Sequence, residues 1–260
     1  MPNLDLIVVS GAGKGIGKAI ALELSKTGSY ILCLSKTENS NYTAEEIKSH
    51  GGNAEGLTID LKDFEAAEEK LIEWSNKKNH KKIGLVLAAG ILGPTGSLIS
   101  TSLKEWEMCF KVNVFGSLVI LKAFLPIMLK NKFGRIITFA GGGSAYPFPI
   151  FQAYSATKTA MVRISENINE DLKDKGDFAI VCLSPGAVET DMLKKVRSAK
   201  AEIKTTVDIS EPVTFAKEFL TAKSCGFSGS FIHVRDNWKE YLNSSMSLSN
   251  SSLWKLRRIE

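Results

Sequence analysis

The chain alternates between apolar runs and amphipathic segments. Short apolar runs bounded by Gly, Pro, Asn or Asp are typical of buried strands, and they fall at residues 4–10, 30–35, 54–59, 83–89, 134–140, 178–184 and 231–234. Between them, apolar residues recur at spacings of three and four, as they do along one face of a helix. Strand and helix in alternation, without an internal repeat, predict an α/β fold: one parallel sheet of about seven strands with helices on both faces.

Two capping-box sequences mark expected helix starts. The first, Thr43–Glu46, predicts a short helix that ends at His50. The second, Ser102–Glu105, opens a long helix whose apolar residues continue from 110 to 125, with Asn113 as a polar residue in its middle. By itself a mid-helix Asn is more typical of an exposed or locally bonded residue than of a functional one.

We expect one domain over residues 1–240, because no linker interrupts the alternation. Residues 241–260 form a Ser-rich tail. Near its end, Leu253–Arg258 contains one Trp and two Leu, which predicts a segment that docks on the domain or on another subunit. A frayed terminus is the alternative.

Composition narrows the class of protein. A hydrophobic content of 44%, a charged content of 23% and a net charge of +5 are ordinary for a soluble globular protein. The densest basic run, Lys77–Lys82, directly precedes an apolar run, so we expect a solvated loop and no nucleic-acid site. No apolar run reaches the roughly 20 residues that span a bilayer, and we expect neither a membrane segment nor a leader. The four cysteines lie far apart without metal-ligand spacing, which predicts reduced thiols, no metal site and a cytoplasmic location.

A glycine-rich turn, Ser10–Gly17, separates the first apolar run from the first helical segment. Strand, glycine turn and helix in this order leave free backbone N–H groups and a helix N-terminus where a pyrophosphate binds. The spacing is Gly-x-x-x-Gly-x-Gly rather than Gly-x-Gly-x-x-Gly, so taken alone the turn also fits a merely flexible connection.

The second apolar run ends at Ser35, and Lys36 follows it, about 20 residues beyond Gly17. An NAD site usually carries an acidic residue at this distance, for the ribose 2′-hydroxyl. Here Ser35 and Lys36 stand there instead, and Lys14 lies in the nearby glycine turn. Two cations suit a 2′-phosphate, so the sequence favours NADP over NAD; two solvated lysines are the alternative.

Tyr154 and Lys158 are four residues apart, one turn from each other on the same face of an expected helix. A phenol has a pKa of about 10, and we expect a neighbouring ammonium to lower the pKa of Tyr154 toward neutrality. Such a pair exchanges a proton with an oxygen held above it. Alone this spacing is common, and a half-buried Tyr beside an exposed Lys has the same sequence.

In their order along the chain, these motifs resemble the short-chain dehydrogenase/reductase family in its shorter, single-domain form. The matching motifs are Ser10–Gly17, Asp60-Leu61, Ala88–Gly90, Asn113, Tyr154–Lys158, and Pro185-Gly186 with Thr190. The resemblance covers roughly residues 4–234 and implies a Rossmann-type, doubly wound parallel sheet.

The resemblance also implies roles for these residues. Tyr154 is the acid/base, Lys158 binds the nicotinamide ribose, and Asn113 fixes a water that links Lys158 to solvent. Asp60 accepts a hydrogen bond from the adenine amino group, although a helix cap is a sufficient reason for an Asp there. The implied cofactor-binding residues are Gly11, Lys14, Gly15, Ile16, Gly17, Ser35, Lys36, Asp60, Leu61, Ala88, Ala89, Gly90, Tyr154, Lys158, Pro185, Gly186, Val188 and Thr190.

One departure from the family pattern affects the catalytic set. The family places a Ser at the end of the fifth strand, where it hydrogen-bonds the substrate carbonyl. We place that position at Ala140, which cannot donate. Either Ser144 reaches back across the intervening glycines to complete the catalytic set, or the substrate supplies its own hydrogen bond.

Two hypotheses of different classes follow. The first is an NADP-dependent oxidoreductase that interconverts a carbonyl and a secondary alcohol on a small molecule, sugar-linked ones included. The second, motivated by Ala140, is a nucleotide-binding protein of the same fold with little turnover, acting as a sensor or assembly partner. The sequence after the last expected strand is too short for the added domain of a sugar-nucleotide epimerase.

Apolar helix faces around Asn113 and Tyr154, together with the resemblance, imply a homodimer or homotetramer.

Overall fold

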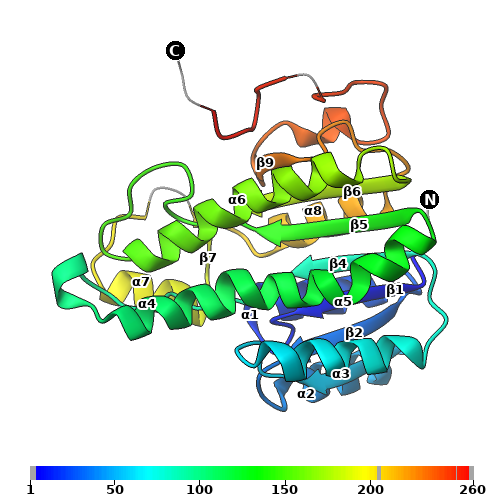
Figure 1. The fold of residues 1–260 in the computed structure, drawn as a ribbon, viewed down its shortest axis with the longest axis horizontal. Helices are drawn as coiled ribbons and strands as arrows, with labels where there is room; N and C mark the ends of the chain where they lie inside the picture. Colours follow the sequence, from blue (N-terminus) through cyan, green and yellow to red (C-terminus); the bar gives the residue numbers. More distant parts are fainter. Residues whose placement is uncertain (1–3, 204–205, 250, 258–260) are drawn as a thin grey trace.

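A seven-stranded parallel sheet forms the centre of the molecule in the computed structural model, which describes residues 4–203, 206–249 and 251–257. The strand order is β3-β2-β1-β4-β5-β6-β9 (Figure 1). The strands are β1 (Leu6–Ser10), β2 (Tyr30–Ser35), β3 (Ala54–Thr58), β4 (Ile83–Leu87), β5 (Phe133–Phe139), β6 (Asp177–Ser184) and β9 (Ser230–His233). The winding direction reverses between β1 and β4, the place where doubly wound folds bind ligands.

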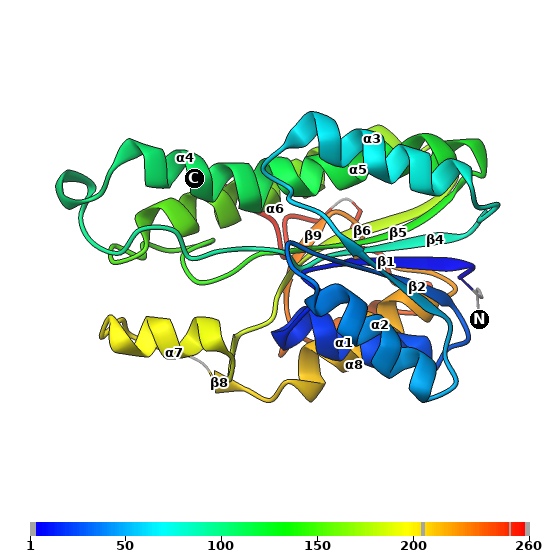
Figure 2. The same ribbon diagram turned by 90° about the horizontal axis from the view of Figure 1, so that it is seen from below.

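Helices cover both faces of this sheet (Figure 2). One face carries α1 (Gly15–Ser25), α2 (Asn39–Ser49) and α8 (Ser210–Thr221), and the other carries α3 (Phe64–Asn76), α5 (Gly116–Lys130) and α6 (Gln152–Leu172). The remaining elements are α4 (Leu103–Phe110), α7 (Asp191–Ser198), the short strands β7 (Ala187–Val188) and β8 (Thr206–Val207), and the 3₁₀ turns η1 (Leu98–Ser100) and η3 (Trp238–Tyr241). This architecture confirms the expected Rossmann-type fold.

Both faces of the sheet are buried, and the strands are apolar for that reason. All residues of β1 and of β5 are buried. Along β1, Ile7 and Val9 belong to the core on the α1 and α8 side, whereas Leu6 and Val8 belong to the core on the α3 and α5 side. Continuous apolar runs, rather than alternating ones, are what a parallel sheet covered on both faces requires.

The two capping-box predictions have different outcomes. At α4 the box is confirmed, since Glu105 N donates to Ser102 Oγ at 3.3 Å and Ser102 N donates to the Glu105 carboxylate at 3.3 Å. At α2 the prediction is wrong, because the helix begins at Asn39 and Thr43 lies inside it. The Thr43 hydroxyl donates to Asn39 O at 3.0 Å and to Ala12 O at 2.9 Å. It therefore ties α2 to the glycine turn instead of capping a helix.

The long helix expected after Ser102 is interrupted by a π-helical turn, Lys111–Phe115, between α4 and α5. Asn113 lies in this turn and is buried. Single π turns inside α-helices are frequent at functional sites. Leu103–Lys130 as a whole is long and apolar enough to cross a membrane, but more than half of its most apolar window is buried inside the protein, as in a core helix.

The C-terminal segment closes the outer edge of the sheet at β9. Phe231 N, on β9, donates to Trp254 O at 2.7 Å. The Trp254 ring packs edge-on against Phe227 and Tyr241, with centroid distances of 6.3 and 5.4 Å. Edge strands with unpaired backbone groups invite association with other chains, and this contact covers part of such an edge.

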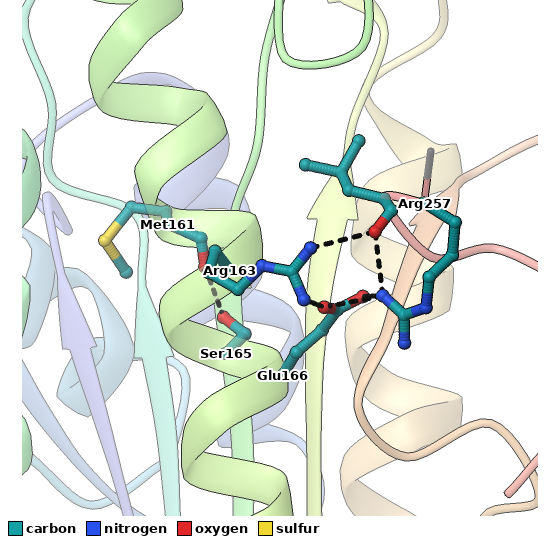
Figure 3. Close-up of polar contacts among 6 residues, drawn as sticks. Met161, Arg163, Ser165, Glu166 and Arg257 are labelled. Atoms are coloured by element: carbon teal, nitrogen blue, oxygen red, sulfur yellow. Dashed lines mark hydrogen bonds and ion pairs between the residues drawn. The ribbon is translucent and has the colours of Figure 1, made fainter. Parts of the chain in front are cut away.

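The same segment is fastened to α6 through a buried carboxylate (Figure 3). The Glu166 side chain is 8% exposed and pairs with both Arg163 and Arg257. Arg257 Nη1 lies 3.1 and 3.2 Å from the two carboxylate oxygens. Arg163 also donates to Leu256 O at 2.8 Å, so the tail contributes both a cation and a backbone acceptor.

We expect Arg257→Ala to lower the free energy of unfolding by about 1 kcal/mol, because it leaves a buried carboxylate with one cation instead of two. Urea denaturation measures the change. The control is Lys175→Ala, which breaks an exposed pair with Asp171 near the end of the same helix. That variant should lose less than about 0.5 kcal/mol. Equal losses in the two variants would contradict a stabilising tail contact.

Candidate active site

A cavity of about 970 Å³ opens at the carboxyl ends of β1, β4, β5 and β6. Its walls come from the glycine turn before α1, the residues that follow β4, β5 and β6, the loop of residues 146–150, α6 and α7. In an open parallel sheet this is the edge at which ligands bind, beside the reversal in strand order.

The glycine turn lets backbone segments approach more closely than a side chain would allow. Gly11 has a φ of +70°, and a Cβ on it would lie 2.9 Å from Ala89 N. A Cβ on Gly17 would lie 2.4 Å from Gly11 O. Lys14 is the N-cap of α1 and makes no capping hydrogen bond with its side chain. The first N–H groups of α1 are therefore free to donate hydrogen bonds to a ligand, and the turn fits a dinucleotide diphosphate.

A hydroxyl joins the two central strands where the turn begins. Ser10 Oγ, at the end of β1, accepts a hydrogen bond from Ala89 N at 3.2 Å. The main chain after β4 is thereby held beside Gly11, which leaves the small residues Ala88, Ala89 and Gly90 lining the cavity.

Tyr154 and Lys158 extend from successive turns of α6 and both line the cavity. They are nearly buried, with 8% and 5% of their surface exposed. Lys158 Nζ lies 5.7 Å from the centroid of the Tyr154 ring and donates to Phe139 O at 3.0 Å. The phenol and the ammonium therefore meet at the end of β5.

Burial governs the protonation of this pair. It raises the pKa of Tyr154 above its ordinary value and lowers the pKa of Lys158 to about 8. The expected lowering of the Tyr154 pKa is therefore wrong for this structure, because burial of the phenol raises its pKa. Tyr154 is a protonated donor near neutral pH, and Lys158 loses its charge as the pH rises through about 8.

Gly141 is the residue that faces the Tyr154 hydroxyl. A Cβ built on Gly141 would lie 2.4 Å from the hydroxyl oxygen and 2.9 Å from Cζ. Ala140 packs with Met161 and Cys182 on the α6 side of the sheet. The expectation that Ala140 takes the place of the family's serine is therefore wrong: Ala140 also lines the cavity, but the residue that meets the phenol without a hydroxyl is Gly141.

Ser144 contacts the backbone of the glycine turn after β5. Its Oγ accepts a hydrogen bond from Gly141 N at 3.0 Å and donates to Gly141 O at 2.8 Å. The residue is 3% exposed and lies outside the lining of the cavity. In this arrangement its hydroxyl closes the turn, and its predicted catalytic role gains no support from its position.

Asn113 holds the loop after β4 beside Lys158. Its Oδ1 accepts from Ile91 N at 2.8 Å, and its Nδ2 donates to Ile91 O at 2.9 Å and to Thr157 Oγ1 at 3.0 Å. A Cβ on Gly90 would lie 3.3 Å from Asn113 Oδ1 and 3.6 Å from Lys158 Nζ. Gly90 thus lies against both Asn113 and the ammonium. The role of Asn113 in holding a water stays a prediction.

The residues expected at the adenosine end have polar partners of their own. Lys36 Nζ lies 3.5 Å from Asp60 Oδ2, and Lys62 Nζ lies 3.4 Å from the same oxygen. Asp63, not Asp60, caps α3, since its side chain accepts from Ala66 N at 3.2 Å. Capping α3 is therefore not the reason for an Asp at position 60.

The two lysines expected to share one phosphate have different partners. Lys14 Nζ lies 3.1 Å from Asp191 Oδ2, at the start of α7, whereas Lys36 Nζ is paired with Asp60. Ser35 is close to the glycine turn, because a Cβ on Gly13 would lie 3.2 Å from its Oγ. Ser35, Lys36, Asp60 and Leu61 lie outside the 970 Å³ cavity. The other implied cofactor residues line it: Gly11, Lys14, Gly15, Ile16, Gly17, Ala88, Ala89, Gly90, Tyr154, Lys158, Pro185, Gly186, Val188 and Thr190.

Comparison with known proteins identifies the family. Residues 5–201 match the family described as short chain dehydrogenase. The chain is a short-chain dehydrogenase. A 3-oxoacyl-[acyl-carrier-protein] reductase, FabG, of Buchnera aphidicola subsp. Schizaphis graminum is 30% identical over 236 residues, which cover 87% of this chain and 94% of that protein. A short chain dehydrogenase of Pseudocercospora fijiensis is 30% identical over 190 residues, 71% of this chain and 60% of that one.

Solved structures share the fold of this short-chain dehydrogenase. A protein from Beutenbergia cavernae, described as an NAD(P) dependent gluconate 5-dehydrogenase with NADP bound at low occupancy, superposes with a TM-score of 0.82 at 28% identity, over 90% of this chain and 96% of that one. An NAD⁺-bound xylitol dehydrogenase superposes with a TM-score of 0.80 at 22% identity, over 88% and 96% of the two chains, and shows the fold alone. The chain is therefore an oxidoreductase whose cleft fits a nucleotide cofactor.

Some cleft residues of this short-chain dehydrogenase carried no recognisable signal in the sequence. Residues 146–150 form one wall, with Leu92, Met192 and His233 nearby in the lining. His233 Nε2 would lie 3.4 Å from a Cβ on Gly186, and burial lowers the pKa of His233. The only hint was general: residues 146–150 lie in the connection between β5 and α6, and loops at the carboxyl edge of a sheet carry binding residues.

We expect Gly17→Ala to lower the free energy of unfolding by about 2 to 3 kcal/mol, because the new Cβ meets backbone atoms that cannot move alone. Gly142→Ala is the matched control, since its Cβ would lie 3.3 Å from the movable ring of Phe148. We expect that variant to lose less than about 1 kcal/mol. Urea denaturation compares them, and a Gly17→Ala variant as stable as wild type would contradict the close approach at the turn.

Proposed function

We propose that this short-chain dehydrogenase interconverts a carbonyl and a secondary alcohol, with NADPH as reductant and NADP⁺ as oxidant. The observation that supports this most directly is the Tyr154 hydroxyl, which is protonated and buried in the wall of a nucleotide-sized cleft beside an ammonium. The relatives that match the chain are named as reductases and dehydrogenases, and they lend no support to a sensor without turnover.

Tyr154 is the proton donor in the proposed reduction. NADPH, which the glycine turn before α1 would hold, would supply the hydride for the new C–H bond at the carbonyl carbon. The π electron pair of the carbonyl moves to the oxygen, and Tyr154 delivers its hydroxyl proton there, so that an alcohol forms. In the opposite direction the phenolate takes the proton back from the alcohol.

Lys158 stabilises the phenolate that this transfer leaves behind. Its ammonium is fixed beside the Tyr154 ring by the hydrogen bond to Phe139 O. A fixed charge that needs no reorganisation stabilises a developing anion more than mobile solvent does. Since the pKa of Lys158 is about 8, the ammonium is present near neutral pH.

The preference for NADP rests on charge at the end of β2. Lys36 follows β2, and the stretch Ser35–Thr37 offers no carboxylate to a ribose 2′-hydroxyl. Asp60 is engaged by both Lys36 and Lys62, which leaves the cluster with a net positive charge. The gluconate 5-dehydrogenase with bound NADP supports this preference, whereas the xylitol dehydrogenase holds NAD⁺.

We expect Lys36→Ala to weaken NADPH binding about five- to tenfold and to leave NADH binding unchanged, because an exposed cation contributes about 1 kcal/mol to a phosphate contact. Fluorescence titration of both nucleotides measures this. Lys62→Ala is the control, since it removes the other lysine at Asp60. Equal weakening of NADPH and NADH in Lys36→Ala would contradict a 2′-phosphate site.

We expect Tyr154→Phe to bind NADPH within about twofold of wild type and to lose at least about 100-fold in turnover, because general acid catalysis contributes that much. Nucleotide binding is followed by fluorescence, and turnover by NADPH absorbance with a panel of ketones and aldehydes. If neither NADPH nor NADH changes the fluorescence or melting temperature of wild type, the proposed function fails. If Tyr154→Phe retains full turnover, Tyr154 is not the acid.

A further inference from the structure

A second cavity of about 660 Å³ adjoins the active-site cleft, and the function proposed above assigns no ligand to it. It is bounded by the loop after β4, the first two turns of α4, and α7. Figure 2 shows α4 and α7 on opposite sides of the loops that follow the strands. Gly90, Leu92 and Met192 line both cavities, so a ligand that enters one can extend into the other.

The inner wall of this second cavity is apolar. Ile91, Leu92 and Met192 contribute to it, together with Met108 from α4 and Phe151 from the start of α6. Phe151 is buried beside Tyr154 in the same apolar cluster. The path from the Tyr154 hydroxyl into the cavity is therefore suited to a hydrocarbon segment rather than to a polyol.

Two lysines face this cavity from opposite walls, Lys104 from α4 and Lys195 from α7. Neither has a carboxylate within 4.0 Å among the described residues. Asp191 is paired with a third lysine of the lining, Lys14, at 3.1 Å, whereas Glu105 keeps its charge because its partner, Ser102 N, is neutral. With three lysines and two carboxylates the lining carries a net charge of +1, and among the described residues Lys104 and Lys195 are its two lysines without an ion pair.

We propose that this cavity binds an anionic group, a carboxylate or a phosphate, at the far end of a largely apolar substrate whose carbonyl lies at Tyr154. This rests on the proposed function, because it assigns the substrate class of the same site. Lys104 and Lys195 determine specificity by binding the remote anion. They take no part in the proton transfer, so their effect falls on binding and not on the chemical step.

The magnitude follows from the exposure of both lysines. An exposed cation–anion contact contributes up to about 1 kcal/mol, which corresponds to roughly fivefold in affinity for each lysine. Salt weakens such contacts, because the screening length falls from about 10 Å at 0.1 M to about 3 Å at 1 M ionic strength. Apolar contacts in the same cavity do not weaken in this way.

The test uses the full-length protein and begins with NADPH titration of wild type, Lys104→Gln, Lys195→Gln and the double variant. We expect equal NADPH affinity in all four. Octanoate, octyl phosphate and 1-octanol are then titrated by calorimetry into each protein saturated with NADP⁺. In wild type we expect the anions to bind at least about fivefold more tightly than the alcohol, and this advantage to shrink at 1 M NaCl.

We expect the affinity for the anions to fall about fivefold in each single variant and about 20-fold in the double variant. The affinity for 1-octanol should stay unchanged. Lys48→Gln, on α2, is the control and should behave as wild type. The stronger of the two anions identifies the carboxylate or the phosphate as the preferred group. Equal binding of anions and alcohol, or anion binding that survives in the double variant, overturns the proposal while NADPH binding stands. Absence of NADPH binding in wild type instead overturns the proposed function.

Discussion

The buried ammonium of Lys158 is the constraint on which the site depends. Only 5% of its surface is exposed, and it is held by a hydrogen bond to the carbonyl of Phe139. Because a buried cation is costly unless it is bonded, this contact fixes α6 against the end of β5. The same burial lowers the pKa of Lys158 and raises that of Tyr154, so the packing that positions the two side chains also sets their protonation.

The strands could be predicted from the sequence because burial on both faces makes each of them a continuous apolar run. Each predicted run overlaps a strand of the central sheet. The start of α2 could not be predicted, because the Thr43 hydroxyl is bonded to Ala12 O, a contact between distant residues. The π turn could not be predicted either, because Asn113 is held there by hydrogen bonds to Ile91 and Thr157, which are distant in the sequence.

The candidate site was predictable only in part, for similar reasons. The pairing of Tyr154 with Lys158 could be predicted from helical spacing, and the diphosphate-binding turn from the glycines between a strand and a helix. Which residue faces the phenol was not predictable, because the run of glycines after β5 does not show which of its positions lies next to Tyr154. The direction of the Tyr154 pKa shift was missed because the depth of burial, which raises that pKa, is a tertiary property.

Gly141 raises the question of what aligns the substrate carbonyl with Tyr154. Loss of a hydroxyl donor at such a position costs about 3 to 4 kcal/mol of transition-state stabilisation. A phenol that is fully protonated retains one strong donor for the carbonyl oxygen, but a single hydrogen bond leaves the substrate free to rotate about it. Binding energy from a remote part of the substrate can fix that rotation. In the proposed substrate class, the apolar wall between α4 and α7 limits that rotation by holding the hydrocarbon segment, whereas Lys104 and Lys195 add affinity for its anionic end.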